Sequence, residues 1–436
     1  MSQDLLNLIQ LRDGMFRHVS NVYSLGDEPR FVAQILDVGD TSAVDRGLSQ
    51  AVGPRLNRKP MQTFGTGINE TDTLLPALGE AFERYSTAVY NSDQFVTASA
   101  EELGSEALDL DTIPRLSKAE LLHPRCPLLE PTKKSPLRWV RGISLLDGRQ
   151  VYLPACMAYL YTGISSPAER IYIPITTGCA AHTSLEQALL GAICEVVERD
   201  AISLTWLQKL PLPGIEVGSI PPELASAWER YEQSCKDLEY LFFDGTSDVG
   251  IPTIYALSVS RANRQVTTLV ACATALNAPE ALAKVIRDLF QIRVAFRKPR
   301  SVPPTWDEFT DFFHGATYMA RAEHSGAFDF LLRQDQRRSL DQIRPLGNGD
   351  VAQSLAAVLS LFRRRGMDVY AVDLSTDEAV RAGIWVVRVI IPSLQPLGFY
   401  YRARYLGHSR LYEAPEKMGY PVHSEAQLNH WPQPFA

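Results

Sequence analysis

Residues 77–90 read ALGEAFERYSTAVY, and residues 192–206 read AICEVVERDAISLTW. Each stretch sets two glutamates three positions apart and places an arginine directly after the second one. The six residues are Glu80, Glu83, Arg84, Glu195, Glu198 and Arg199. Apolar side chains recur at helical spacing around both motifs, which predicts a helix over each stretch. Residues three apart on a helix lie about 60° apart, so each glutamate pair shares one face.

Carboxylate pairs in apolar helices are costly to bury unless their charge is neutralised. The arginines supply one positive charge per pair, so divalent cations are the economical way to balance the rest. Oxygen-only ligands favour Mg²⁺ over Zn²⁺, and Mg²⁺ usually arrives with phosphate oxygens in its shell. The motifs therefore indicate a nucleoside triphosphate bound through Mg²⁺, although no GxxxxGK[ST] loop is present. The alternative is that each motif is a solvated helix face with internal salt bridges.

Composition excludes several classes of protein. The chain has 436 residues, 45% of them hydrophobic, as expected for a globular protein with a buried core. A net charge of −7 gives no basic footprint, so no nucleic-acid partner is expected. The apolar runs are too short for a membrane span and no signal peptide is evident, which predicts a cytoplasmic protein without membrane association. The six cysteines form no CxxC pair and the histidines lack zinc-binding spacing, so free thiols and no zinc site are expected.

The order of apolar patterns and turn residues predicts an α+β protein. Strands are expected at 30–38, within 137–175 around a DG turn, and within 250–276. Helices are expected at 72–90, from Ser184 onward with Gln187 as its capping-box partner, and at 279–297. A later helix should end at Gly366 and lead into two further strands in a βα-type arrangement. Two glycine-bearing turns, FGTG and TTGCA, are expected directly before the motif helices.

Single residues and short segments carry four further expectations. Pro76 should lie in the first turn of its helix, where proline is tolerated. The polar, proline-rich residues 100–140 indicate an excursion on the surface. Trp206 and Trp385 are assigned to the core. The alternation of Pro432 and Pro434 predicts an extended tail.

Five stretches together resemble the YcaO superfamily, in the order that the family has them. They are FGTGINETDTLLPALGEAFERYS, TTGCAAHTSLEQALLGAICEVVERDAISLTW, LNAPEALAKVIRDLFQIR, GIWVVRVIIPSLQPL and the terminal LNHWPQPFA. The resemblance covers nearly the whole chain and points to the cyclodehydratase D proteins, which form azoline rings in ribosomally synthesised peptides. It implies a YcaO-type α+β fold around an acidic ATP and Mg²⁺ pocket. We expect an N-terminal strand and loop region at 1–60 and a YcaO catalytic domain at 61–436, ending in an extended tail at 428–436.

The resemblance also implies a set of site residues. The metal ligands would be Glu80, Glu83, Glu195 and Glu198. The other residues at ATP would be Arg84, Arg199, Gln187, Lys284 and Asp288. Gln187 stands where the family usually has a glutamate, and Thr66 stands where it commonly has lysine. Lys284 and Asp288 replace an arginine and a glutamate four apart on one helix face, which keeps the charges but changes the geometry.

The tail is the second part of the implied site. In the family it commonly reads PxPxP and is thought to reach the active site with its terminal carboxylate. Here it reads PQPFA, so Ala436 replaces the last proline and still provides a carboxylate. The resemblance makes Pro432, Pro434 and Ala436 candidate catalytic residues. Either the carboxylate of Ala436 or His430 would take the amide proton, unless His430 is an ordinary tail residue.

The implied activity is ATP-dependent conversion of Cys, Ser or Thr in a precursor peptide to thiazoline or oxazoline. The implied partners are that peptide, a leader-binding protein with a ubiquitin-activating-enzyme-like fold, and a second copy of the chain in a homodimer. A flavin-dependent dehydrogenase is a further candidate partner. Two alternatives remain open: a thioamide synthetase of the same family, and a non-catalytic scaffold that binds a peptide or partner. The departures at Thr66, Gln187 and Ala436 motivate the scaffold.

Overall fold

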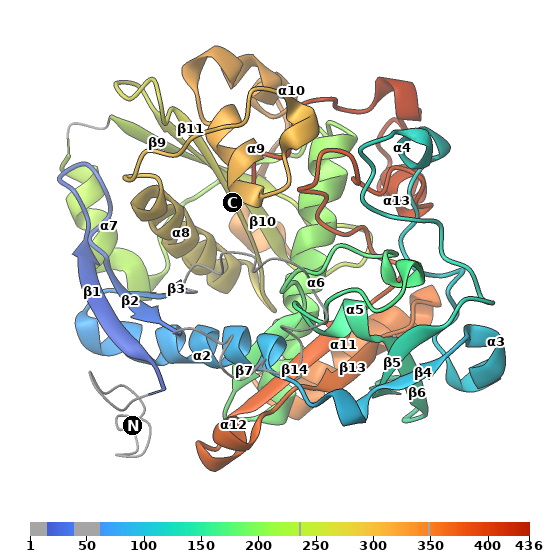
Figure 1. The fold of residues 1–436 in the computed structure, drawn as a ribbon. Coiled ribbons are helices and arrows are strands. Elements are labelled where there is room, and N and C mark those ends of the chain that lie inside the picture. The colour runs from blue at the N-terminus through green and yellow to red at the C-terminus, as the bar shows by residue number, and fades with distance from the viewer. Residues whose placement is uncertain (1–14, 39–61, 235–236, 348) are drawn as a thin grey trace.

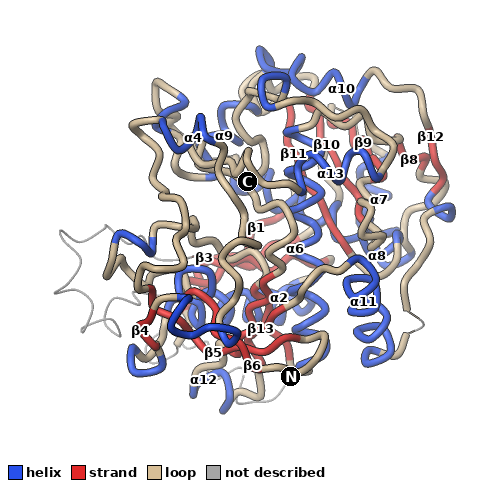
Figure 2. Tube along the Cα trace, turned by 90° about the vertical axis from the view of Figure 1, so that its right-hand side faces the viewer, coloured by secondary structure: helices blue, strands red, loops and turns tan. Residues whose placement is uncertain are grey.

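The computed structural model describes residues 15–38, 62–234, 237–347 and 349–436, and it confirms an α+β architecture. Strands in these residues form three sheets, of three, five and six strands. The five-stranded and six-stranded sheets lie at opposite ends of the molecule, with the long helix α6 (Leu185–Leu207) between them (Figures 1 and 2). Elements that the sequence separates by a hundred residues or more are therefore packed around one central helix.

The first motif helix, α2, covers the three-stranded sheet. The antiparallel order is β1 (Arg17–Tyr23), β2 (Val32–Asp37) and β3 (Gln62–Gly67), and α2 (Glu70–Ala88) follows β3 directly. Gly65 lets the helix approach closely, because a Cβ there would lie 1.9 Å from the Thr73 carbonyl oxygen. The sheet joins residues on both sides of the expected domain boundary at residue 60, since β2 pairs with β3 along its length.

The five-stranded sheet carries α8 on one face. Its order is β11 (Thr268–Thr274), β10 (Thr253–Ser260), β9 (Leu238–Asp244), β8 (Gly214–Glu216) and β12 (Arg337–Ser339). The helix α8 (Ala278–Ala295) confirms the helix expected at 279–297; it begins at the cap Asn277 and has Pro279 in its first turn. It packs on β10 and β11 through a buried apolar face that includes Leu282, Ile286 and Leu289.

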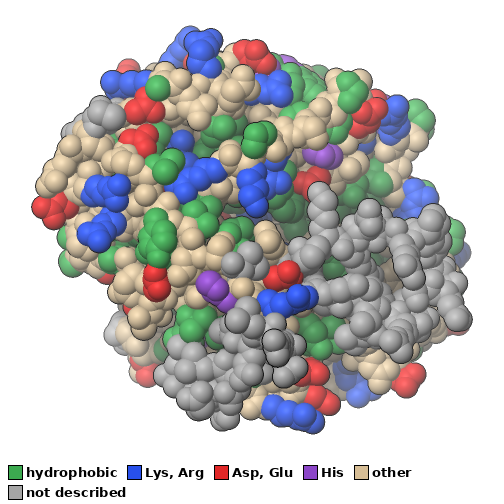
Figure 3. Space-filling view, turned by 60° about the vertical axis from the view of Figure 1, so that its left-hand side comes forward, with side chains coloured by type: hydrophobic (Ala, Val, Ile, Leu, Met, Phe, Trp, Pro, Cys, Tyr) green, Lys and Arg blue, Asp and Glu red, His purple; other side chains and the backbone are tan. Residues whose placement is uncertain are grey.

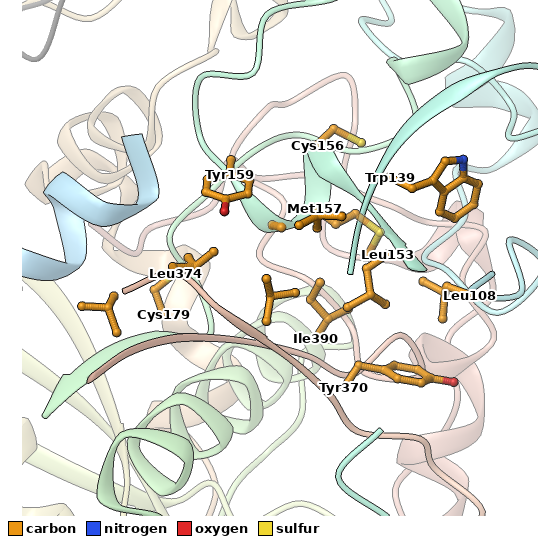
Figure 4. Packing of buried hydrophobic residues seen from close by; sticks show 14 of the residues in the cluster. Leu108, Trp139, Leu153, Cys156, Met157, Tyr159, Cys179, Tyr370, Leu374 and Ile390 are labelled. Carbon is orange, nitrogen blue, oxygen red and sulfur yellow. The ribbon is translucent and has the colours of Figure 1, made fainter. Parts of the chain in front are cut away.

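The six-stranded sheet completes the opposite end of the molecule. Its strands are β4 (Val96–Ala98), β5 (Leu137–Ser144), β13 (Tyr370–Asp373), β14 (Trp385–Ile390) and β7 (Cys179–His182), with β6 (Gln150–Pro154) paired to β5. Asp147 and Gly148 turn β5 into β6, which confirms the DG hairpin. Figure 4 shows the buried side chains beside this sheet, among them Trp139, Met157 and Ile390.

The remaining helices complete the covering layers. They are α3 (Ala100–Leu103), α4 (Lys118–Leu122), α5 (Ala155–Ala158), α7 (Ala225–Glu232), α9 (Phe312–Met319), α10 (Asp329–Leu332), α11 (Val351–Arg365), α12 (Asp377–Arg381) and α13 (Arg410–Lys417). The expected end of α11 is confirmed, because Gly366 takes the left-handed conformation with φ 65°.

Several local expectations are wrong. Pro76 lies in the second turn of α2, because the helix begins at Glu70 rather than near Asp72. FGTG is not a turn, since all four residues belong to β3. The strands β13 and β14 are antiparallel neighbours, so the unit is not of the βα type.

Two burial expectations also fail. Residues 100–140 are not a mere surface excursion, because Leu108, Leu110 and Ile113 are buried in the main core. Trp206 is buried, but Trp385 is 41% exposed at the start of β14. The average polarity of a segment does not reveal the single side chains that anchor it in the core. A local pattern also does not show which side chains of a strand face the core and which face solvent.

Candidate functional site

Glu80 is held in place by the strand that precedes its own helix. One carboxylate oxygen accepts a hydrogen bond from the backbone N–H of Phe64 in β3, at 2.7 Å. The other accepts from the Arg84 guanidinium at 3.3 Å, one helical turn along. Arg84 also donates to the Thr176 hydroxyl at 2.7 Å, on the segment that leads into β7. The first motif is thus tied to β3 and to the segment before β7.

Glu83 differs from Glu80 because its carboxylate makes no hydrogen bond with any described residue. Burial raises the pKa of Glu83 well above its usual range. Arg84 opposes this shift, while the nearby carboxylates of Glu195 and Glu80 raise the pKa further. A cation bound beside Glu83 would stabilise its ionised carboxylate.

The second motif repeats the arrangement of the first. Glu195 accepts from the backbone N–H of Gly178 at 2.9 Å and from Arg199 at 3.2 Å. Gly178 has φ +83°, and a Cβ there would lie 2.3 Å from the Val389 carbonyl oxygen, so only glycine fits this turn. The turn that positions Glu195 is therefore set by the expected TTGCA stretch.

Glu198 faces the five-stranded sheet and α8. Its side chain is 5% exposed, and one oxygen accepts from the backbone N–H of Thr274 at 3.1 Å and from Lys284 Nζ at 3.0 Å. Asp288 lies one turn further along α8. Burial raises the pKa of Asp288 to about 7, and Glu198 adds to the rise while Lys284 opposes it.

Three helices thus bring one group of charges together. Glu83 and Glu195 interact electrostatically across α2 and α6, and Arg199 interacts with both Glu195 and Glu198. The group extends through Lys284 to Asp288 on α8. The expected meeting of the two motifs therefore matches the geometry. On the face in Figure 3, by contrast, side chains of both signs are interspersed.

The carboxylate oxygens at this group suit Mg²⁺ that binds together with phosphate. Among the residues that the structure describes, no three His, Cys, Asp or Glu side chains form a ready-made metal cage. Mg²⁺ does not require one, because it usually binds through one or two carboxylates and fills its shell with water and phosphate oxygens. Glu83 is uncommitted within the described part of the chain and Glu195 is 20% exposed, so both can receive an ion.

Gln187 lies apart from this group. It is exposed in the first turn of α6, about 12 Å along the helix axis from Glu195. Its backbone N–H donates to the Ser184 hydroxyl at 3.3 Å, which is half of the expected capping box. The other half is absent, because the Ser184 N–H donates to His182 instead. Its expected role at ATP remains a prediction.

The tail is extended as expected and is anchored at several points. Trp206 Nε1 donates to the Trp431 carbonyl at 3.2 Å, and the N–H of Asn429 donates to the Leu207 carbonyl at 2.8 Å. Pro432 and Pro434 are buried. Ala436 packs against a small apolar cluster at the edge of the five-stranded sheet. His430 is exposed, and its ring stacks on Trp431 rather than on the charged group.

Sequence reasoning missed several residues that complete the site. The Thr176 hydroxyl and the backbone N–H groups of Phe64 and Thr274 gave no pattern that could have revealed them, whereas the glycine of TTGCA marked the turn at Gly178. Arg388 did give a signal, since it is the one charge in the apolar strand WVVRVI. It is buried, donates to the Ile175 carbonyl and to the Cys179 sulfur, and lowers the pKa of Glu83.

Three further expectations concern the cysteines, membrane-spanning helices and Thr66. Cys126, Cys156, Cys179, Cys194 and Cys272 are free, as expected, and Cys235 lies outside the described residues. No described helix is both long and apolar enough to cross a membrane. Thr66 faces α8, where its hydroxyl donates to Gln291 at 3.4 Å.

Comparison with known proteins gives matches over most of the chain. A family model described as YcaO cyclodehydratase, ATP- and Mg²⁺-binding, matches residues 64–395. An uncharacterized protein of Methanothermobacter thermautotrophicus is 25% identical over 370 residues, which are 84% of this chain and 90% of that protein.

Three solved structures share the fold. A heterocyclase in complex with substrate and cofactor has a TM-score of 0.78 at 21% identity, covering 99% of this chain and 56% of the other. YcaO from Methanopyrus kandleri, bound with AMPPCP and Mg²⁺, has 0.61 at 15% identity, covering 88% and 87%. The Escherichia coli microcin synthetase McbBCD complex with pro-MccB17 bound has 0.62 at 16% identity, covering 99% and 98%. This chain thus spans about half the length of the first structure.

Proposed function

The chain belongs to the YcaO family, and from that premise we propose that it is an ATP-dependent peptide cyclodehydratase. A Cys, Ser or Thr side chain of a precursor peptide attacks the carbonyl carbon of the preceding residue. The carbonyl oxygen then takes the γ-phosphoryl group of ATP and leaves as phosphate. ADP is released, and the peptide loses the elements of one water per thiazoline or oxazoline ring.

One observation carries the proposal: α2 and α6 bring Glu83 and Glu195 together in a partly accessible group that is short of positive charge. A solvated, salt-bridged helix face would leave each glutamate paired with its own arginine. Glu83 is instead unpaired among the described residues, and its raised pKa marks a place where a cation lowers the free energy of the protein.

The residues at this group receive separate roles. We place Mg²⁺ at Glu83, with Glu80, Glu195 and Glu198 as the further candidate ligands. The chemistry that Mg²⁺ supplies when bound is neutralisation of phosphate charge. Arg84 and Arg199 hold the carboxylates of Glu80 and Glu195 in place.

Lys284 supplies positive charge from the side of α8. Its side chain is 42% exposed, so its amine can reach phosphate while it stays near Glu198. Asp288, four residues along, faces the same side of the helix. The two residues keep the charge pair that the family shows at these positions.

The anchored tail suits a role near the reacting amide. We assign the amide proton to the terminal carboxylate of Ala436, because the tail end is packed against the sheet that also positions Glu198. His430 is the weaker candidate, since its exposed ring stacks on Trp431 and Trp306. Buried Pro432 and Pro434 would fix the course of the tail.

Partner proteins form the remaining part of the proposal. The matched McbBCD structure is a complex with a bound peptide, and its similar chain has the same extent as this one. We propose that a leader-binding partner with a ubiquitin-activating-enzyme-like fold delivers the precursor peptide to a homodimer of this chain. A flavin-dependent dehydrogenase would act afterwards, by oxidising azolines to azoles.

The test combines the purified chain, its precursor peptide, the leader-binding partner, ATP and Mg²⁺. We expect ADP release together with loss of one water per ring by mass spectrometry, and much slower modification without the partner. Replacement of oxygen by sulfur in the presence of sulfide would identify a thioamide synthetase instead. Absence of both ADP and mass change, with no binding of ATP, would support the scaffold.

A further inference from the structure

Phe435 connects the C-terminal tail to the second motif. Its ring lies over the guanidinium of Arg199, with 4.7 Å between the Arg199 Cζ atom and the ring centroid. The backbone of Phe435 forms a parallel bridge with Val270 of β11, and the side chain is 5% exposed. The ring is therefore fixed by the sheet edge and is not a mobile cover.

Arg199 depends on this ring for part of its placement. Its terminal nitrogen donates to Glu195, but its Nε is buried without a hydrogen-bond partner among the described residues. A long side chain with one hydrogen bond keeps many rotamers unless packing removes them. An aromatic face attracts a guanidinium and leaves its edge free to donate to carboxylates.

In the first motif, the arginine is held in place without an aromatic ring. Arg84 has two hydrogen-bonded anchors, the Glu80 carboxylate and the Thr176 hydroxyl. Within the described residues Arg199 has only Glu195 as such an anchor, and its second contact is the ring of Phe435 instead of a hydroxyl. The two arginines thus occupy equivalent positions in the motif, but one is held by two hydrogen bonds and the other by a hydrogen bond and a cation–π contact.

We propose that Phe435 is a positioning residue, which holds Arg199 so that Glu195 and Glu198 stay in the geometry that binds Mg²⁺ and ATP phosphates. The inference rests on the proposed function and deepens it. It means that seating of the tail and affinity for Mg·ATP are linked: displacing residue 435 loosens Arg199, and through it Glu195.

The experiment measures Mg·ATP affinity by calorimetry on the full chain, without peptide, for the wild type, Phe435→Leu and Phe435→Tyr. Leucine keeps apolar packing but removes the aromatic face, whereas tyrosine keeps it. From the strength of cation–π contacts we expect Kd to rise about 3- to 10-fold for Phe435→Leu. Phe435→Tyr should stay near the wild-type value, and the KM for ATP should rise more than kcat falls.

Tyr152→Leu provides a matched control, because it removes the ring of β6 that Arg141 stacks on, and the groups that act on Arg141 are Tyr152 and Glu106 rather than the motif glutamates. It should leave Mg·ATP affinity unchanged. Wild-type and Phe435→Leu proteins with equal Kd and equal KM for ATP would overturn the role of Phe435 alone. A wild type that binds no Mg·ATP would overturn the proposed function as well.

Discussion

The two motif helices carry the same five-residue pattern, yet their second glutamates end in different states. The first glutamates are equivalent, since Glu80 and Glu195 each accept from a backbone N–H and from the arginine four residues on. Glu83 has no such partner among the described residues, while Glu198 holds both Thr274 and Lys284. The motif therefore determines which side chains face the site, and the residues packed around the motif determine which of these side chains is free to bind a cation.

The largest effect is expected from removing the free carboxylate. Glu83→Gln should lower kcat/KM for ATP about 100-fold, because one charged ligand to the phosphate-bound cation is lost. The melting temperature should stay equal or rise, since an unpaired, partly buried charge disappears. Both quantities come from an ADP assay and thermal unfolding.

Glu413→Gln is the matched control for this change, because it makes the same substitution on the exposed side of α13, where Glu413 pairs with Lys417. It should alter neither activity nor melting temperature by a measurable amount. Full ATP turnover by Glu83→Gln would show that the first motif is only a salt-bridged helix, and that Glu83 and Glu198 do not differ in function.

A smaller loss of activity, joined by a loss of stability, is expected for Glu198→Gln. The amide still accepts from Thr274, but Lys284 loses its counter-charge, so the free energy of unfolding should fall by about 1 kcal/mol. Activity should fall about tenfold through displaced Lys284 and Asp288. Denaturant unfolding beside the ADP assay checks this. An unchanged stability would show that Glu198 is as free as Glu83.

Equal effects are expected for the two equivalent glutamates. Glu80→Gln and Glu195→Gln each keep an oxygen for the backbone N–H and each weaken the pairing with Arg84 or Arg199. Their kcat/KM values for ATP should each fall several-fold and agree within about a factor of three, which is about 0.6 kcal/mol. A large difference between them would show that the two halves of the site contribute unequally.

A last effect is expected on stability alone, as a pH dependence of the protein without ligands. Because the pKa of Asp288 is raised to about 7, the folded state holds a proton that the unfolded state releases above about pH 4. This group therefore lowers stability progressively as pH rises from about 4 to 7. Asp288→Asn should flatten that part of the curve of unfolding free energy against pH. An identical slope in both proteins would contradict the raised pKa.

Much of the fold followed from local patterns. The cap at Ser184, the DG turn, the glycine end of α11 and the proline tail are set by side chains within a few residues, so their signals survive without tertiary context. Pro76, FGTG and Trp385 were misplaced because helix starts, strand edges and exposed strand ends depend on what packs against them. Gly178 is the backbone donor that residue type marked, whereas the N–H groups of Phe64 and Thr274 left no trace in it.

The sequence by itself determined the family and the two glutamate-bearing helices, with the charges they display, because helical periodicity and residue type are local properties. The tertiary structure decided which carboxylate stays unpaired and which partners hold the rest. Phe64 and Gly178 lie 16 and 17 residues from Glu80 and Glu195, and their N–H groups reach these glutamates because α2 packs on β3 and α6 packs on β7. Thr274 and Phe435 lie much further along the chain from Glu198 and Arg199, and only packing of the five-stranded sheet against α6 brings them together. Hydrogen bonding and cation–π contact act over a few ångströms of space, whatever the separation in sequence.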